Sequence, residues 1–443
     1  MQNIKDLINQ HKYADIKNIL INMSEADIAE ILEELDNDSL IKIFRLLPKN
    51  LAALVFSYLE IEKQQIIIKS LSTKEAASIL DNMYADDAAD LIDEMPANMV
   101  KQLLANTTKE TRRDINFLLK YPDDSAGSLM TVEFIDIKEK NTVKEALDKI
   151  KKEAQNTENI NVTYVVDKER KLLGSVSLKK LLISNEDDLV SSIMDKISTN
   201  INTLTDQEEV ANEFKKYDVT ILPVVDLEDR LVGIITVDDI MDIVEEETTE
   251  DIEKMAAITP NDKPYMKTGI FETWKKRIPW LLILMISATF TGKIIQSYEQ
   301  ALASYVVLTT FIPMFMDTGG NAGGQASVTV IRALSLNEID FKDIFKIIWK
   351  EMRVAILIGI TLAIANFLKL MIIDNVSIDI AFVVCLTLVI TIFCAKIVGC
   401  SLPILAKKIG FDPAVMASPF ITTIVDALSL IIYFQIATML LRI

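Results

Sequence analysis

Two carboxylates stand inside long apolar stretches of this sequence, where an ionised side chain is costly. Asp426 lies about 13 residues into the apolar run 413–441, and Asp317 lies midway along the run 301–331. An ionised Asp at the centre of a bilayer costs about 2.5–3.5 kcal/mol on insertion scales, so such a residue usually faces the interior of a helix bundle and marks an ion path. A protonated carboxyl, or a hydrogen bond between helices, is the alternative explanation for each residue.

Neutral oxygen ligands accompany both carboxylates. Pro313 and a run of glycines surround Asp317, and Pro419 precedes Asp426. These residues either let helices approach closely or loosen them, so that carbonyls face a water-filled path. Oxygen ligands with few charges suit a hard cation, magnesium in particular, because magnesium keeps several waters and needs only one or two carboxylates. The candidate ligands of the ion path are Asp426, Asn321, Gly320, Thr422, Asp317 and Ser418.

The apolar runs predict five membrane spans of about 20 residues or more. They lie at about 278–297, 301–331, 347–372, 378–405 and 413–441. Lys and Arg gather in alternate connections, whereas the connections around 297–300 and 374–379 contain neither. By the positive-inside rule, we expect a protein of the plasma membrane with a cytoplasmic N-terminus and a C-terminus outside.

The net charge of -18 is unevenly distributed. Residues 271–443 hold 11 acidic and 14 basic residues, a balance of +3, which leaves 53 acidic and 32 basic residues, or -21, in residues 1–270. Such a distribution excludes a simple soluble enzyme, and an acidic cytoplasmic part repels nucleic acid but attracts cations. The sequence contains no GxxxxGK[ST] loop, so we expect no ATP hydrolysis and no enzymatic activity.

An internal repeat with an offset of 59 residues occupies the region from about 130 to 245, where residues 164–178 align with 223–237. Each copy predicts two strands around a glycine turn, followed by a helix, and resembles one half of a tandem CBS domain pair. In that family a Gly-x-x-Thr-x-x-Asp run often holds a nucleotide, and Gly233, Thr236 and Asp239 have this spacing. Lys180 replaces the Asp in the first copy. The alternative is that Thr236 only caps the following helix.

The spacing of apolar residues in 1–127 predicts a superhelix of short helices. Ser24, Ser72 and Asp86 mark the expected N-termini of three of these helices. Acidic clusters lie at 81–94 and 238–253, and the second belongs to a helix expected to run to about Ile258. Asp86 and Asp90 are four residues apart on one helix face, so they repel each other unless a cation screens them. A solvated helix face is the alternative explanation.

The order of these parts resembles the MgtE family of magnesium transporters along essentially the whole chain. The motifs are residues 121–130, residues 317–323 and Pro419 with Asp426. The resemblance implies a homodimer in membrane lipid with a magnesium pore at the dimer interface, centred on Asp426, and a connecting helix that plugs the pore when cytoplasmic magnesium is high. It implies magnesium sensors at Asp86, Asp90, Gly127, Asp218, Asp239, Asp242, Glu247, Glu250 and Asp251. Magnesium is thus both cargo and regulator, and ATP is a candidate ligand of the CBS pair at Thr236 and Asp239.

We therefore expect a multi-domain protein with an all-α superhelical N-terminal domain, an α/β tandem CBS pair, a plug helix and five transmembrane helices. The predicted boundaries are 1–127, 128–190, 191–243, 244–270 and 271–443. The predicted function is magnesium uptake gated by cytoplasmic magnesium. Two alternatives stay open: a transporter of cobalt or manganese, and a CBS-regulated membrane sensor that transports nothing.

Overall fold

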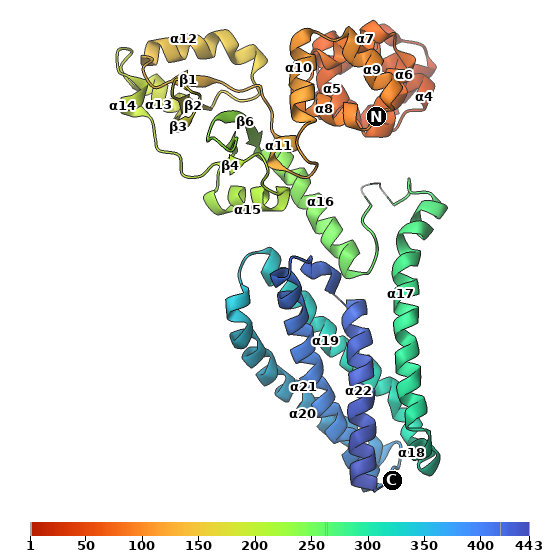
Figure 1. Ribbon diagram of the computed structural model, residues 1–443. Coiled ribbons are helices and arrows are strands. Elements are labelled where there is room, and N and C mark those ends of the chain that lie inside the picture. The colour runs from red at the N-terminus through yellow and green to blue at the C-terminus, as the bar shows by residue number, and fades with distance from the viewer. Residues whose placement is uncertain (1, 262, 264, 417, 443) are drawn as a thin grey trace. The chain divides into compact units, whose positions relative to one another are not determined.

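The computed structural model describes residues 2–261, 263, 265–416 and 418–442 (Figure 1). The chain folds into two compact units, Met1–Val244 and Glu245–Ile443. The first unit contains short helices and two small sheets, and the second contains long helices.

Ten helices of eight to ten residues open the first unit. Side-chain caps start several of them: Ser24 accepts from the Asp27 amide, and Ser72 forms a capping box with Glu75. The buried faces of these helices carry Ile, Leu and Ala and form one apolar core. The helices are α1 (Gln2–Asn9), α2 (Tyr13–Leu20), α3 (Glu25–Glu33), α4 (Asn37–Phe44), α5 (Lys49–Ser57), α6 (Ile61–Ser70), α7 (Thr73–Leu80), α8 (Ala85–Asp93), α9 (Ala97–Asn106) and α10 (Lys109–Leu118).

The start of α8 differs from the prediction. Ser24 and Ser72 are N-caps as expected, but α8 begins at Ala85 with Tyr84 in the N-cap position. The Ala85 amide instead donates to Glu133 Oε1 at 3.1 Å. Asp86 therefore lies inside the first turn of α8 and is not its N-cap.

The repeat predicted from the sequence forms two three-stranded sheets of the same topology. In each sheet the first strand pairs in parallel with the second, and the second pairs antiparallel with the third. The strands are β1 (Asp136–Lys138), β2 (Val162–Val166), β3 (Leu172–Ser177), β4 (Ile201–Asn202), β5 (Ile221–Val225) and β6 (Leu231–Thr236). The accompanying helices are α11 (Ala126–Leu129), α12 (Val143–Glu153), the 3-10 helix η1 (Ala154–Asn156), α13 (Leu178–Ile183), α14 (Val190–Ile193), α15 (Gln207–Tyr217) and α16 (Val237–Met255).

The two repeats interlock through their glycines. Gly174 of β3 lies against Met194 and Asp195, which precede the second repeat, and Gly233 of β6 lies against Met130 and Thr131, which precede the first. Backbone hydrogen bonds accompany both contacts, with Ser175 pairing with Asp195 and Thr131 with Ile234. Each repeat thus completes the sheet edge of the other.

The helix α16 carries the chain from one unit into the other, because the boundary after Val244 falls within it. It ends at Met255, three residues before the predicted end, and Ala257 then adopts a left-handed φ of 56°.

In the part of the chain that the structure describes, the second unit contains five helices of at least 24 residues joined by short ones. Helix α21 packs against α19, α20 and α22, so it lies at the centre of the bundle. The elements are α17 (Ile270–Ser297), α18 (Glu299–Ser304), η2 (Val306–Phe311), α19 (Ile312–Ser335), η3 (Phe341–Asp343), α20 (Ile344–Ile372), α21 (Ile378–Lys408), η4 (Pro413–Met416) and α22 (Ser418–Leu441).

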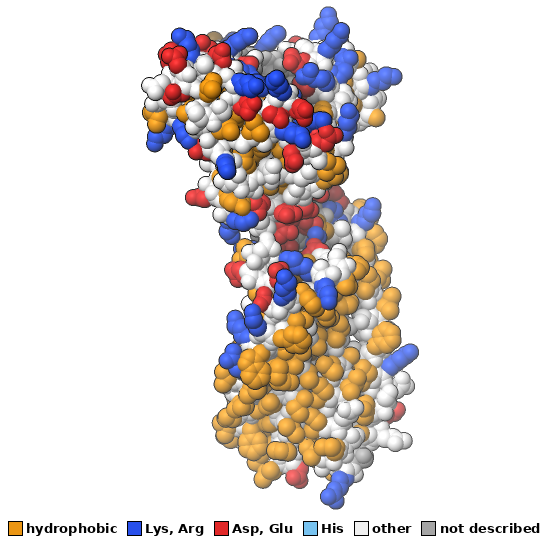
Figure 2. Space-filling model, turned by 60° about the vertical axis from the view of Figure 1, so that its left-hand side comes forward, with side chains coloured by type: hydrophobic (Ala, Val, Ile, Leu, Met, Phe, Trp, Pro, Cys, Tyr) orange, Lys and Arg blue, Asp and Glu red, His pale blue; other side chains and the backbone are white. Residues whose placement is uncertain are grey.

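Four helical segments in the described part of the chain are long and apolar enough to cross a membrane: Ile270–Ser297, Phe341–Ile372, Ile378–Lys408 and Pro413–Leu441. Figure 2 shows the matching surface, an expanse of hydrophobic side chains that few charges interrupt. The second of the five predicted spans, 301–331, is not one helix, because the chain turns through α18 and η2 before α19 begins at Ile312. Helix α19, which carries glycine and amide residues, is not among these four segments.

The glycine contact between the repeats gives a test of the fold. A Cβ at Gly233 would lie 2.8 Å from the Thr131 carbonyl oxygen, so Gly233→Ala forces a backbone shift. Overpacking of this kind costs about 1–3 kcal/mol, so we expect the melting temperature of the first unit to fall by several degrees in calorimetry. Gly292→Ala is the control, because a Cβ there meets nothing within 4 Å. Equal melting of both variants would contradict the interlocked arrangement.

Candidate functional site

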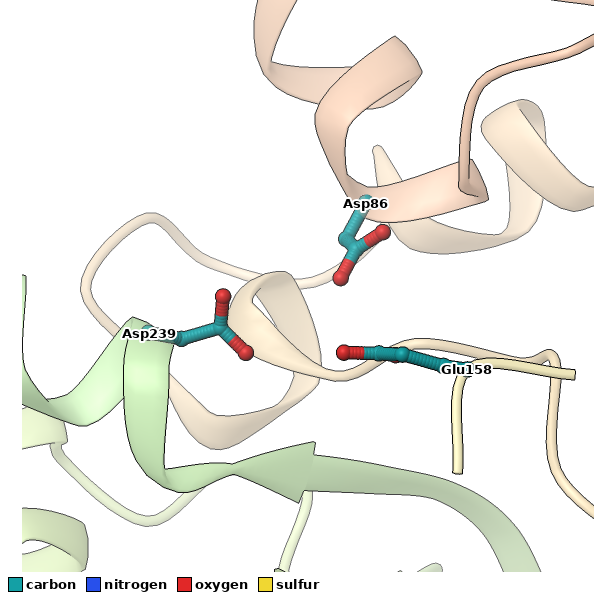
Figure 3. A group of neighbouring side chains, drawn as sticks. All are labelled: Asp86, Glu158 and Asp239. Carbon is teal, nitrogen blue, oxygen red and sulfur yellow. The ribbon is translucent and has the colours of Figure 1, made fainter. Parts of the chain in front are cut away.

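Three carboxylates from distant parts of the sequence converge in the first unit (Figure 3). Asp86 comes from the first turn of α8, Glu158 from the segment between η1 and β2, and Asp239 from the first turn of α16. One oxygen of each lies within 4.8 Å of the others. We call Asp86, Glu158 and Asp239 the carboxylate cluster.

The carboxylate cluster is short of hydrogen-bond donors. Asp86 Oδ1 and Glu158 Oε2 are buried without a hydrogen-bond partner. The Thr236 hydroxyl lies 3.2 Å from Glu158 Oε1 and 2.8 Å from Asp239 Oδ2, and its single proton serves one of them at a time. Among the ion pairs that the structure describes, none includes a cluster residue.

Mutual repulsion and burial make the charged form of the cluster costly. Two unit charges about 4.8 Å apart repel by about 3 kcal/mol at an effective dielectric constant of about 20. Burial, with Asp87 and Glu158 nearby, raises the pKa of Asp86 well above its usual range. Burial and Asp239 raise the pKa of Glu158 to about 7, and burial with Asp239 raises that of Asp87 to about 6. Protons or a cation must therefore compensate this charge.

The geometry fits a hydrated divalent cation. Two oxygens on opposite sides of a magnesium ion are about 4.2 Å apart, because each ligand lies at about 2.1 Å. Oxygens at a spacing of up to 4.8 Å therefore reach such an ion after a small movement or through a bridging water. Asp86 and Glu158 each have one buried oxygen without a hydrogen-bond partner that could accept such an interaction.

The structure brings two of the predicted sensor residues, Asp86 and Asp239, into the cluster and leaves others outside it. Asp90, Asp218 and Asp242 are exposed. Gly127 is buried in α11, and its amide donates to the Thr203 carbonyl at 2.9 Å. No ligand role for these residues follows from their positions alone.

The remaining predicted sensors, Glu247, Glu250 and Asp251, belong to the second unit on the far half of α16. Near these predicted magnesium sensors, the ammonium group of a lysine lies between two carboxylates. Lys254 Nζ lies 2.5 Å from Glu250 Oε1 and 2.7 Å from Asp412 Oδ2. Burial and the neighbouring Asp412 raise the pKa of Asp251. Met255 packs beside this pair against Ile331 and Ala414.

The predicted ion-path residues gather along the contact between α19 and α22. Asp317 and Asn321 lie on an exposed face of α19, where Asn321 Nδ2 donates to Asp317 Oδ1 at 3.1 Å. Asp426 on α22 is partly buried, and its Oδ1 has no hydrogen-bond partner. A Cβ at Gly320 would lie 2.9 Å from Thr422 Cγ2, so these two residues are in contact across the helices. The side chain of Ser418 lies outside the described residues.

One of the two interpretations of the Pro and Gly residues in α19 and α22 is that they loosen these helices and free backbone carbonyls. The structure contradicts that interpretation. Helix α19 is continuous from Ile312 to Ser335, and its glycines serve close packing instead. Pro419 lies in the first turn of α22, where a missing N–H costs nothing. Because α22 begins at Ser418, Asp426 lies about 12 Å along it, rather than the roughly 20 Å expected for a span that starts at 413.

Three buried or partly buried charged residues escaped the sequence reasoning. Glu158 follows the 3-10 helix η1 in an irregular segment, and no pattern there distinguishes it from other surface acids. Glu351 and Lys396 are charged residues inside apolar runs, which is a readable signal, and they pair with each other in the structure.

The raised pKa values predict how pH affects stability when divalent cations are absent. The folded protein holds protons on Glu158 and Asp87 that the unfolded chain releases near pH 4, so stability falls as pH rises from about 4 to about 7. We expect calorimetry in a chelator to show a lower melting temperature at pH about 8 than at pH about 5. Magnesium should remove most of that difference.

Glu158→Gln should flatten the pH dependence in the chelator, because it removes one of the repelling charges. Glu169→Gln is the matched control, since Glu169 is exposed and lies outside the cluster. If the two variants had the same pH dependence, the electrostatic account of the cluster would be wrong.

Three family models match the chain in sequence order. "MgtE intracellular N domain" matches residues 23–124, "CBS domain" matches 126–184 and 190–246, and "Divalent cation transporter" (MgtE) matches 312–436. The magnesium transporter MgtE of Thermus thermophilus is 38% identical over 336 residues, which cover 75% of this chain and 73% of that protein. The magnesium transporter MgtE of Bacillus subtilis is 37% identical over 339 residues, which cover 76% and 74%.

Two solved structures resemble the first unit. The cytosolic domain of the Mg2+ channel MgtE in complex with ATP has a TM-score of 0.52 and 35% identity, and covers 54% of this chain and 98% of that one. The soluble part of a magnesium transporter has a TM-score of 0.53 and 29% identity, and covers 56% and 97%. Because the matched segments share one order and the identity extends over three quarters of the chain, this protein belongs to the MgtE family of divalent cation transporters.

Proposed function

We propose that this protein carries Mg²⁺ across the cell membrane through a path that contains Asp426. The observation that carries the proposal is the unpartnered Asp426 oxygen on a membrane-spanning helix, beside the Asp317–Asn321 pair of α19. The related proteins named magnesium transporters support magnesium as the cargo. A membrane potential contributes about 2.3 kcal/mol per charge per 100 mV, so uptake of a divalent cation needs no ATP hydrolysis.

We further propose that the path is completed by a second copy of the chain. Asp317 and Asn321 lie on an exposed face of α19, and such polar residues are costly against lipid. A homodimer places them at the interface, away from lipid. In this arrangement α19 is the fifth span, shielded from lipid on its polar side, and an odd number of spans puts the C-terminus outside.

Gating is proposed to act through α16, which begins at the carboxylate cluster and carries Lys254 in its last turn. A divalent cation held by Asp86, Glu158 and Asp239 fixes the start of α16, while the Lys254 bridge to Asp412 fixes its end. Loss of the cation restores repulsion in the cluster and frees the start of the helix. Asp412 lies just before η4 and α22, so movement of α16 reaches the helix that carries Asp426.

ATP binding by the CBS pair is a further part of the proposal. The related cytosolic domain that contains ATP supports it, as do Gly233, Thr236 and Asp239 at the expected spacing. Asp239 belongs to the carboxylate cluster, and the Thr236 hydroxyl donates to it. Calorimetric titration of ATP with and without magnesium therefore tests whether ATP and magnesium share this region.

Asp426→Asn is the direct test of the ion path. We expect at least a tenfold loss of Mg²⁺ uptake into proteoliposomes, because the substitution removes the negative charge that compensates a dehydrating cation. Asp374→Asn is the control, since Asp374 pairs with Lys369 beyond the end of α20. Unchanged Mg²⁺ uptake by Asp426→Asn would remove Asp426 from the mechanism.

The same assay separates the alternatives. Faster uptake of Mn²⁺ or Co²⁺ than of Mg²⁺ would favour a transporter of those ions. Uptake no greater than in empty liposomes for every divalent cation would favour a membrane sensor without transport.

Lys254→Met tests the gate. The lysine neutralises Glu250 and Asp412 without a metal, so its loss should weaken the closed state and raise the cytoplasmic Mg²⁺ concentration needed for closure several-fold. Patch-clamp recording with defined internal Mg²⁺ measures this shift. Lys263→Met, which removes the exposed pair with Glu272, is the control. Closure at the wild-type concentration in Lys254→Met would contradict the proposed role.

A further inference from the structure

A buried ion pair lies inside the membrane unit, apart from the proposed ion path. Lys396 on α21 is 5% exposed, and its Nζ lies 3.5 Å from Glu351 Oε2 on α20. The Glu351 side chain is 13% exposed, and its Oε2 has no hydrogen-bond partner. Both helices are among the segments apolar enough to cross a membrane.

Anchoring α20 to α21 does not require such a pair. A buried ion pair loses hydration on both partners, and replacing it by apolar residues of similar volume is often neutral or stabilising. The two helices already pack through an apolar core that includes Ala355, Leu388 and Ile392. The ion pair therefore calls for a role beyond holding two helices together.

The turn of α21 that carries Lys396 is also the turn that packs on α19. A Cβ at Gly399 would lie 2.2 Å from the Gly323 carbonyl oxygen, and a Cβ at Gly323 would lie 3.2 Å from the Ala395 carbonyl oxygen. Backbones in such close contact leave no compressible side chain between them. A displacement of the turn 395–399 must therefore displace Gly323.

Gly323 lies three residues after Gly320 and two residues after Asn321, the proposed path residues on the same continuous helix. Gly320 in turn contacts Thr422 of α22, four residues before Asp426. A series of direct contacts thus leads from Glu351 through Lys396 and the glycine contact to the ligands of the ion path.

We propose that Lys396 and Glu351 are positioning residues that set the spacing of α19 against α22, and with it the ion selectivity of the path. The attraction between the two buried charges depends on the distance between them and is strong in an interior of low dielectric constant, whereas apolar contacts tolerate small slides. The inference rests on the proposed transport of Mg²⁺ and adds the residues that tune it.

The test uses full-length protein in proteoliposomes and the ratio of initial Mg²⁺ to Ca²⁺ uptake. The variants are Lys396→Met, Lys396→Arg, the apolar double variant Lys396→Met/Glu351→Met and the charge swap Lys396→Glu/Glu351→Lys. Lys369→Met is the matched control, because its pair with Asp374 spans 3.2 Å but its side chain is 53% exposed. Melting temperatures of the purified proteins separate folding from function.

We expect Lys396→Met to melt lower and to lose at least tenfold in Mg²⁺ uptake, because it leaves Glu351 buried and unpaired. The apolar double variant should recover the melting temperature, while its Mg²⁺ to Ca²⁺ ratio stays at least threefold below that of the wild type. Lys396→Arg should retain most of the ratio, and the charge swap should recover part of it.

A wild-type ratio in the apolar double variant would overturn the inference, because the pair would then be purely structural. A ratio in Lys369→Met as low as in that double variant would overturn it too. Absence of uptake in the wild type would overturn the proposed function and this inference together. Loss of uptake in Asp426→Asn with an unchanged ratio in the apolar double variant would leave the proposed function standing and overturn only the inference.

Discussion

A charge removed from water needs a compensating charge, and this constraint shapes three parts of the protein. The carboxylate cluster of Asp86, Glu158 and Asp239 has no compensating cation among the described side chains, so it must take up protons or a divalent cation. The end of α16 meets the same demand with an internal ammonium, that of Lys254. In the membrane unit, Lys396 and Glu351 satisfy each other.

These solutions differ in what they make the protein respond to. A cluster compensated by an external cation is sensitive to the concentration of that cation, whereas an internal lysine is not. Helix α16 joins one site of each kind, since Asp239 lies in its first turn and Lys254 near its end. The start of α16 is held only while a cation occupies the carboxylate cluster, whereas its end is held by Lys254 at any cation concentration. Such a helix suits a gate, because only its start is released when the ion leaves.

Close contact between backbones at glycine residues is a second feature that both units share. In the CBS pair, Gly174 and Gly233 let each repeat pack against the segment that precedes the other. In this arrangement Thr236 and Asp239 lie next to Glu158. In the membrane unit, Gly323 and Gly399 bring α19 and α21 into direct backbone contact. Both contacts transmit position without a side chain in between, so small shifts at one element must move the next.

The sequence by itself determined the elements that are local in character. The short helices with their Ser24 and Ser72 caps, the repeat around 164–178 and 223–237, most of the apolar spans and the membership in one family follow from spacing, periodicity and motif order. It also singled out Asp426 and Asp239 as candidate functional residues. Only the tertiary structure brought Glu158 to Asp86, paired Glu351 with Lys396, and showed that the glycines of α19 pack a continuous helix. The physical reason is that helix and strand patterns report the environment of each residue along one element, whereas these contacts join residues 45 or more positions apart, which no local periodicity encodes.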